Sequence, residues 1–271
     1  MVVADNCAGF VDFAFDNFQD HSGITLIIGV VCFAFQIYGD FSGYSDMAIG
    51  LGKLLGFDLM TNFKVPYFSR DVAEFWRRWH ISLSTWFRDY VYFPLGGSKE
   101  GKTKSIRNVL IIFLVSGFWH GANWTYIVWG GLNGLFFIPL LIRNKNRNYL
   151  DTVAEGKTFA KINEISKIVF TFTLICIAWI FFRASNLEQA FLYIGTILDN
   201  ILLIDFPNSA ILNLFLIGIL IFIEWVGRVN DVPIEFNNTS RLFRQIFYVA
   251  LVLSVCLFFD YNTKAFIYFQ F

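Results

Sequence analysis

The residue best suited to chemistry in this sequence is His120, one of only three histidines among 271 residues. It stands in the stretch GFWHGANW, with the apolar run NVLIIFLVSGFW before it and WTYIVWGGLNGLFFIPLLI after it. Two interpretations are open: a core histidine that hydrogen-bonds a neighbour, or a general base whose near-neutral imidazole accepts a proton. Ionisable groups inside apolar segments are costly and are functional by default, so the position favours the base.

His80 is a second candidate, and it follows the sequence WRRW. Its spacing alone fits an interfacial residue without a chemical role better than a catalytic one. The two histidines are too far apart in sequence to predict a metal site, no carboxylate stands at ligand spacing, and no HExxH or paired zinc motif is present. The sequence therefore predicts no metal centre.

Asp40 and Asp46 are further candidates, in YGDFSGYSDMAIG at the end of an apolar run. They either mark a helix end that reaches the membrane interface, with turn-forming Ser and Gly, or form a polar wall of a substrate cavity as hydrogen-bond acceptors. The sequence does not separate these interpretations. The serines lack the GxSxG elbow of α/β-hydrolases, and LGKLLG does not match a phosphate-binding loop.

The composition indicates that the helices carrying these candidate residues lie in a membrane. The chain is 56% hydrophobic and 15% charged, whereas soluble domains carry about 25% charged residues. The predicted fold class is all-α, a polytopic membrane protein. The formal net charge is zero and no basic arm is present, so the sequence predicts no nucleic-acid binding. The cysteines form no CxxC pair and are interpreted as small hydrophobes: Cys7, Cys32, Cys176 and Cys256.

Transmembrane helices need about 20 mostly apolar residues. Loops rich in Lys and Arg mark the cytoplasmic side, and these are 143–167 and 228–244, whereas the connection 184–209 has neither residue. This arrangement places the C-terminal tail on the outer side. The candidate membrane regions are 23–39 with its continuation MAIGLGKLLGF, 108–142, 166–182, 210–226 and 245–259.

The region 108–142 is predicted to be a hairpin whose turn lies inside the membrane. Arg107 and Arg143 are both predicted to be cytoplasmic, while the apolar segment 109–119 is too short to cross a core of about 30 Å at about 1.5 Å per residue. Irregular backbone at membrane depth is tolerated only where protein buries it or where it lines a wet cavity. The Gly-Ala-Asn turn would then place His120 at the tip of the hairpin, facing a cavity.

The stretch 65–97 is predicted to be an amphipathic helix, or a broken pair of helices, that is interfacial or re-entrant. Its apolar residues recur at helical spacing on one face, and its charged residues fall mostly on the others. Asp71 and Glu74 are typical of a capping pair near a helix start, and FPLGG is a stop signal. The apolar face consists of Val72, Phe75, Trp76, Trp79, Leu83, Trp86, Phe87 and Tyr90.

Three stretches together resemble the membrane-bound O-acyltransferase (MBOAT) superfamily: DFSGYSDMAIGLGKLLGF, NFKVPYFSRDVAEFWRRWHISLSTWFRDYVYFPLGGS and RNVLIIFLVSGFWHGANWTYIVWGGLNG. The most similar branch is the bacterial alginate O-acetyltransferase type. That branch also includes enzymes that acetylate peptidoglycan or cellulose, and the teichoic-acid D-alanyl transferase. The resemblance implies that residues 1–271 form the C-terminal part of an MBOAT domain, with the N-terminal membrane helices of the family absent.

The resemblance also implies roles for individual residues. His120 would be the near-invariant histidine of the superfamily and the catalytic base, and His80 with its Trp and Arg neighbours would help to form the floor of the catalytic chamber. The basic helix is expected to hold an acidic donor, and Asn123 is a candidate hydrogen-bond donor to an oxyanion. The expected substrate- and donor-binding residues are Asp40, Asp46, Arg77, Arg78, Trp79, Trp119 and Asn123.

The implied function is transfer of an acetyl group from a cytoplasmic thioester, acetyl-CoA or an acyl carrier protein, to hydroxyls of an exported or cell-wall polysaccharide such as alginate, cellulose or peptidoglycan. No bound cofactor is expected. The location would be the bacterial cytoplasmic (inner) membrane, with a periplasmic or extracellular acetyltransferase as a further partner. Two other classes stay open: a transporter or flippase in which His120, Asp40 and Asp46 form a proton or substrate path, and a non-catalytic assembly subunit of a polysaccharide export complex.

The tail KAFIYFQF adds Tyr268 as a third candidate catalytic residue. In one interpretation Phe266, Phe269 and Phe271 anchor the terminus at the interface, as aromatic belts do. In the other, Tyr268 enters the outer mouth of the His120 cavity, accepts the acyl group and passes it to an outer acceptor. A tyrosine nucleophile needs an adjacent base, and His120 would supply it.

Overall fold

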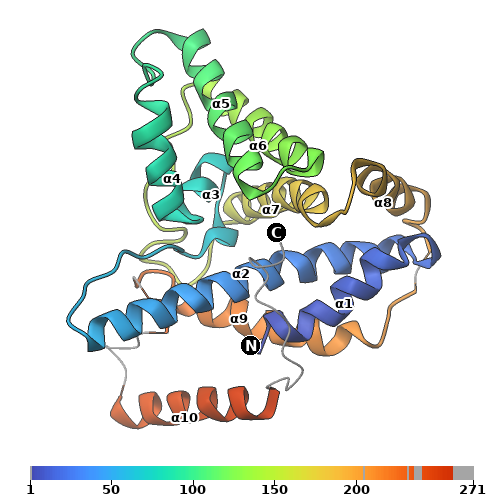
Figure 1. Ribbon diagram of the computed structural model, residues 1–271. Helices are drawn as coiled ribbons and strands as arrows, with labels where there is room; N and C mark the ends of the chain where they lie inside the picture. Colours follow the sequence, from blue (N-terminus) through green and yellow to red (C-terminus); the bar gives the residue numbers. More distant parts are fainter. Residues whose placement is uncertain (1, 204, 231, 235–239, 259–271) are drawn as a thin grey trace. The chain divides into compact units, whose positions relative to one another are not determined.

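The computed structural model is all-helical over the residues that it describes, which are all but 1, 204, 231, 235–239 and 259–271 (Figure 1). No strand occurs in this part of the chain, so the all-α part of the predicted fold class is confirmed. The α-helices are α1 (Ala4–Asp16), α2 (Gly23–Leu54), α3 (Val72–Arg78), α4 (Ile81–Phe87), α5 (Lys102–His120), α6 (Trp124–Ile142), α7 (Ile162–Arg183), α8 (Leu187–Asp199), α9 (Ala210–Gly227) and α10 (Arg241–Phe258).

Five of the described helices are long and apolar enough to cross a membrane: α2, α6, α7, α9 and α10. Each one overlaps a region that the sequence predicts to be membrane-embedded, and α7 and α10 begin four residues before the predicted starts. α2 has 32 residues and therefore extends about 48 Å, longer than a bilayer core of about 30 Å. The continuation of the first span through MAIGLGKLLGF is thus confirmed in part, since α2 ends at Leu54.

The chain divides into two compact units, of which the first comprises Met1–Met47 and Phe191–Phe271. In its core, Phe15 of α1 stacks on Tyr193 with ring centroids 4.4 Å apart, and the Tyr193 hydroxyl donates to the carbonyl of Leu26 at 2.9 Å. The Tyr38 hydroxyl of α2 donates to the buried carboxylate of Glu224 in α9. This hydrogen bond satisfies a polar group that is otherwise costly inside apolar helices.

The second unit, Ala48–Ala190, contains α3 to α7 and both histidines singled out by the sequence. α5 and α6 lie side by side as a hairpin (Figure 1), and α6 also packs on α7. Glycines bring α5 and α6 together, because a Cβ at Gly130 would overlap the carbonyl oxygen of Phe113. Close backbone approach at small residues is a common way for membrane helices to associate.

The stretch 65–97 is a broken pair of helices, so a single amphipathic helix is the wrong alternative. α3 ends at Arg78, His80 adopts a left-handed backbone with φ 43° and ψ 58°, and α4 then begins and continues into a π-helical turn, η3 (Arg88–Tyr92). The capping prediction is confirmed: the Asp71 side chain accepts from the backbone N–H of Glu74 at 2.7 Å.

Two helices, α1 and α8, were not predicted, and α5 begins earlier than predicted. α1 and α8 have 13 residues each, too few for a search based on spans of about 20 residues. α5 begins at Lys102 instead of residue 108, because a helix can include a basic first turn that an apolar pattern leaves out. With 19 residues it is about 28 Å long, so the intramembrane position of the hairpin turn stays a prediction.

Candidate functional site

His120 is the last residue of α5, and aromatic rings from three helices surround it. Its imidazole meets the rings of Trp129 from α6 and Phe182 from α7 edge-on, with centroids 5.2 and 5.1 Å away. Trp119, which precedes it on α5, is 4.9 Å away and half exposed. The imidazole is intermediate between buried and exposed, and we call His120 together with these three rings the His120 pocket.

A chain of buried indoles continues from this pocket toward α3. Trp129 stacks on Trp179 of α7 with centroids 5.9 Å apart, and Trp179 lies 5.3 Å from Trp79 at the end of α3. Each of these three tryptophans is 2% exposed. Trp79, predicted to line the chamber, is therefore part of a buried aromatic core that connects the end of α3 with the rings of the His120 pocket.

His80 follows Trp79 directly, at the break between α3 and α4. Its Nδ1 lies 3.4 Å from the Ser82 hydroxyl, and its ring faces Phe63 with centroids 6.4 Å apart. Burial lowers the pKa of His80 to about 4, and a hydrogen bond with its own backbone opposes this effect only partly. His80 and His120 are close enough for their charges to interact, so the structure brings the two histidines into one region.

Asn123 forms the N-cap of α6, in the turn directly after His120. Its Oδ1 accepts from the backbone N–H of Thr125 at 3.1 Å, and its Nδ2 donates to the carbonyl of Ser185 at 3.0 Å. Asn is a preferred N-cap residue, and its position before an apolar helix is a signal that the sequence carries. In this arrangement the amide serves the hairpin turn, and its role as an oxyanion donor stays a prediction.

Arg77 binds the loop that joins α6 and α7. Its two terminal nitrogens donate to the carbonyls of Asn146 and Tyr149 at 2.7 and 2.8 Å. Arg78, the next residue, donates to the carbonyl of Asp151 in the same loop at 2.9 Å. Both guanidinium groups are therefore engaged with the protein's own loop, and donor binding by them stays a prediction.

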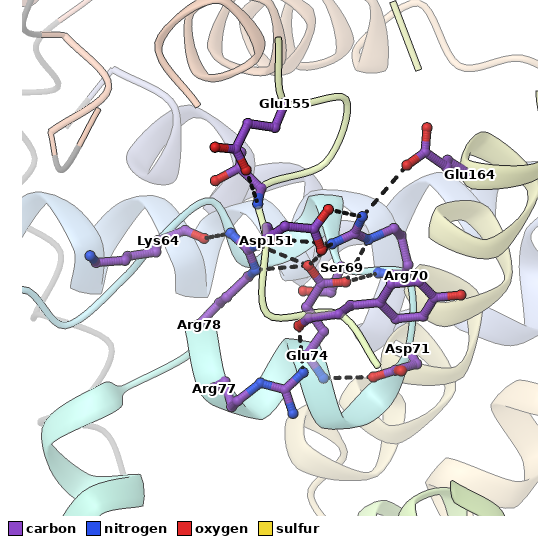
Figure 2. Close-up of polar contacts among 12 residues, drawn as sticks. Lys64, Ser69, Arg70, Asp71, Glu74, Arg77, Arg78, Asp151, Glu155 and Glu164 are labelled. Atoms are coloured by element: carbon purple, nitrogen blue, oxygen red, sulfur yellow. Dashed lines mark hydrogen bonds and ion pairs between the residues drawn. The ribbon is translucent and has the colours of Figure 1, made fainter. Parts of the chain in front are cut away.

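A buried ion cluster lies between α3 and this loop (Figure 2), and the sequence interpretation did not include it. The Glu74 side chain is 1% exposed and is contacted by Arg70 at 2.9 Å and by Arg78 at 2.8 Å. Arg70 also pairs with Asp151 at 3.0 Å and with Glu164 of α7 at 3.5 Å. Glu74 and Arg78 stand four residues apart on α3, and this helical spacing is the signal that could have predicted part of the cluster.

The remaining predicted site residues lie elsewhere. Asp40, partly buried, and Asp46, exposed, belong to the part of α2 in the first unit, and their role in a cavity wall stays a prediction. Tyr268 lies outside the described residues, as do the tail phenylalanines discussed with it. Among the residues that the structure describes, no three His, Cys, Asp or Glu side chains group in a way that could hold a metal ion.

The comparison with known families bears on the segment that carries both histidines. The family model described as MBOAT, membrane-bound O-acyltransferase family, matches residues 7–186. This range includes the whole of α2 to α7 and thus the His120 pocket and the ion cluster. The chain belongs to the membrane-bound O-acyltransferase family. With five candidate spans, this MBOAT chain is a multi-pass membrane protein.

Curated bacterial relatives agree with this assignment. The chain is 45% identical over 189 residues to the probable alginate O-acetylase AlgI of Pseudomonas putida, covering 70% of this chain and 35% of the relative. It is 43% identical over 190 residues to the peptidoglycan O-acetyltransferase of Helicobacter pylori, covering 70% and 34%. It is 34% identical over 162 residues to the teichoic acid D-alanyltransferase of Streptococcus thermophilus, covering 55% and 39%. The chain spans about a third of the length of these relatives.

Proposed function

We propose that this chain carries the catalytic histidines of an O-acyltransferase that moves an acetyl group from a thioester to hydroxyls of an exported or cell-wall polysaccharide. The observation that supports this most is the imidazole of His120, enclosed by Trp129 and Phe182 and within electrostatic reach of His80. The names of the relatives supply the acceptor class: alginate and peptidoglycan for two of them, teichoic acid for the third.

In the proposed reaction His120 acts as a general base. It takes the proton of the acceptor hydroxyl while the hydroxyl oxygen attacks the thioester carbonyl and forms a tetrahedral intermediate. Collapse of this intermediate forms the ester and breaks the C–S bond, and the imidazolium of His120 returns the proton to the departing thiolate. A base of this kind typically contributes about 10²–10⁴-fold to the rate.

His80 is proposed to stabilise the oxygen that becomes negative. Since burial lowers the pKa of His80 to about 4, its ring is neutral at physiological pH and keeps one N–H to donate. A neutral donor near a developing oxyanion stabilises it without adding a charge to the resting site. The surrounding indoles would meanwhile exclude water and thereby protect the thioester from hydrolysis.

The route of the two substrates is proposed from topology. The thioester, acetyl-CoA or an acyl carrier protein, would approach from the cytoplasmic side of the bacterial inner membrane, and the polysaccharide from the outer side. A histidine at membrane depth, at the tip of the α5–α6 hairpin, is accessible to both. Donor binding by Arg77 and Arg78 would require the loop 143–161 to release their guanidinium groups, because both bind its carbonyls.

Tyr268 provides a second proposed step, in which the acyl group passes through the tail before it reaches an outer acceptor. The tyrosine oxygen would attack the thioester carbonyl, and the C–S bond would break to release the thiol, which takes up the tyrosine proton. The hydroxyl of the polysaccharide would then attack the tyrosyl ester, take the acyl group and give its proton to the departing tyrosine oxygen. An acyl adduct on Tyr268, detected by mass spectrometry in protein incubated with donor alone, supports the relay. Its absence under conditions of active transfer favours the aromatic anchor instead.

The test of the proposed function is acetyl transfer by His120→Ala in the full-length membrane protein. We expect the rate to fall to about a hundredth or less of the wild-type rate, because the base is removed. His21→Ala is the matched control: this third histidine lies in the first unit beside Phe13, and its loss should leave transfer intact. Proton-coupled transport without acyl transfer by the wild type would instead favour a transporter.

A further inference from the structure

His80 has a backbone conformation that requires support from its surroundings. Its φ of 43° lies in the left-handed region, which side chains other than glycine adopt rarely. A residue held in such a conformation at a functional site persists only when neighbouring structure fixes it. The short helices on either side, α3 and α4, have seven residues each and cannot fix the angle between them by themselves.

The segment 62–64 provides this support from both sides of His80. Before the histidine, the backbone N–H of Lys64 donates to the carbonyl of Arg78 at 3.0 Å. After it, the backbone N–H of Ile81 donates to the carbonyl of Asn62 at 3.0 Å. These two hydrogen bonds lie on either side of His80 in the sequence, so the position of His80 depends on that of segment 62–64.

The Asn62 side chain adds a third hydrogen bond to the two that flank His80. Its Oδ1 accepts from the backbone N–H of Ser82 at 3.1 Å, in the first turn of α4. This N–H has no partner within its own helix, because the first turn of a helix leaves its donors unsatisfied. Asn62 therefore holds the two residues that follow His80, one through its main chain and one through its side chain.

The ion cluster fixes the other end of the same segment (Figure 2). Arg78 donates to the carbonyl of Lys64 at 3.3 Å while Glu74 accepts from the same guanidinium at 3.1 and 2.8 Å. Segment 62–64 is thus tied to α3 at Lys64 and to α4 at Asn62. Of these two contacts, only the one at Asn62 involves a neutral side chain, which can be changed without leaving a buried charge.

We propose that Asn62 is a positioning residue, which acts through His80 by fixing the start of α4. This inference rests on the proposed function, in which His80 acts together with His120. Asn62 itself does not touch the reacting atoms in this account. Loss of its side-chain acceptor would loosen the backbone around His80, lower the rate of the acyl-transfer step and leave binding of the thioester donor largely unchanged.

The experiment is a double-mutant cycle on acetyl transfer in the full-length protein, with Asn62→Ala, His80→Ala and both changes together. Asn62→Ala should lower kcat by about fivefold, the effect expected for one lost hydrogen bond, with little change in the KM for the donor. Asn62→Asp keeps the acceptor and should restore most of the rate. In the His80→Ala background, Asn62→Ala should have no further effect.

The outcomes separate this inference from the proposed function. Equal losses from Asn62→Ala in both backgrounds would overturn the positioning role and leave the role of His80 intact. Full activity of His80→Ala would overturn the proposed role of His80 and this inference with it. The midpoint temperature of unfolding shows that each variant is folded, and the Asn62→Asp protein shows whether a loss comes from the missing acceptor or from general damage.

Discussion

The His120 pocket and the ion cluster around Glu74 lie in the same compact unit and are held by different kinds of interaction. The imidazole contacts the aromatic rings of Trp129 and Phe182, which approach it edge-on. The Glu74 carboxylate instead accepts hydrogen bonds from two arginines, Arg70 and Arg78, at 2.7 to 3.1 Å.

This difference indicates that the His120 pocket and the ion cluster respond differently to substitution. The ring contacts of His120 with Trp129 and Phe182 do not require one charge state of the imidazole, so this packing can persist while the imidazole gains and loses a proton. A buried ion cluster has the opposite property, because removing one partner leaves the others charged and desolvated. We therefore expect changes in the pocket to affect the rate more than the stability, and changes in the cluster to affect the stability more than the rate.

The largest expected effect on stability is that of Glu74→Ala. This change removes the one buried carboxylate that both Arg70 and Arg78 contact and leaves Arg70, 2% exposed, with only the more exposed Asp151 and Glu164, which should cost about 3–5 kcal/mol in the free energy of unfolding. The midpoint temperature of unfolding of the purified protein measures it. Glu100→Ala is the control: Glu100 also pairs with a cation four residues away, Lys104, but both side chains are about half exposed, and little change is expected. Similar losses in both variants would refute the contrast.

A smaller effect is expected at the glycine contact between α5 and α6. In Gly130→Ala the new Cβ would overlap the carbonyl oxygen of Phe113, and the helices would have to move apart, at a cost of about 1–3 kcal/mol. Because α5 and α6 carry His120 and Trp129, transfer should fall as well. Gly131→Ala is the matched control, since its Cβ would meet only the Leu114 side chain at 3.8 Å. Equal behaviour of the two variants would show that the close contact does not matter.

The smallest expected effect concerns Asp151, through which the stability of the ion cluster depends on pH. The hydrogen bond from Arg70 holds the pKa of Asp151 below its usual value, against an opposing effect of desolvation. Since the folded pKa is depressed, the contact stabilises the protein above the unfolded pKa of about 3.9 and is lost as the pH falls through the folded value. Asp151→Asn should lower the free energy of unfolding by less than about 1 kcal/mol at neutral pH, because the side chain is 57% exposed.

Unfolding of Asp151→Asn and wild type between neutral and acidic pH checks this sign. The difference between them should shrink as the pH falls below about 3.9. Asp58→Asn, a change at an exposed carboxylate outside the cluster, is the matched control. A difference that grows on acidification would contradict the assignment of the stabilising contact to the ionised form of Asp151.

Local signals in the sequence predicted much of the fold and part of the site. Apolar runs predicted the candidate membrane helices, and the capping residue Asp71 predicted the start of α3. His120 at the end of an apolar segment was recognisable because an imidazole there is unusual. Each of these features depends on residues that are close together along the chain.

The parts that the sequence did not predict depend on tertiary contacts. A broken pair of helices was one of the two predicted alternatives for 65–97, but the position of the break was not predicted, because WRRWHIS contains no glycine or proline and is compatible with a continuous helix. The break exists because segment 62–64 binds both sides of the histidine. The partners of Arg77 and Arg78 likewise come from a loop about 70 residues later in the chain, and no local pattern specifies that contact.

The most direct test of the central claim, that His120 is the base for acyl transfer, is chemical rescue of His120→Ala with imidazole. The substitution leaves a space between Trp129 and Phe182 that matches the missing ring. Added imidazole should raise the transfer rate of this variant by about tenfold or more, and the rescued rate should increase with pH as imidazole loses its proton. A His120→Ala protein that retains more than about a tenth of the wild-type rate without imidazole would contradict the claim.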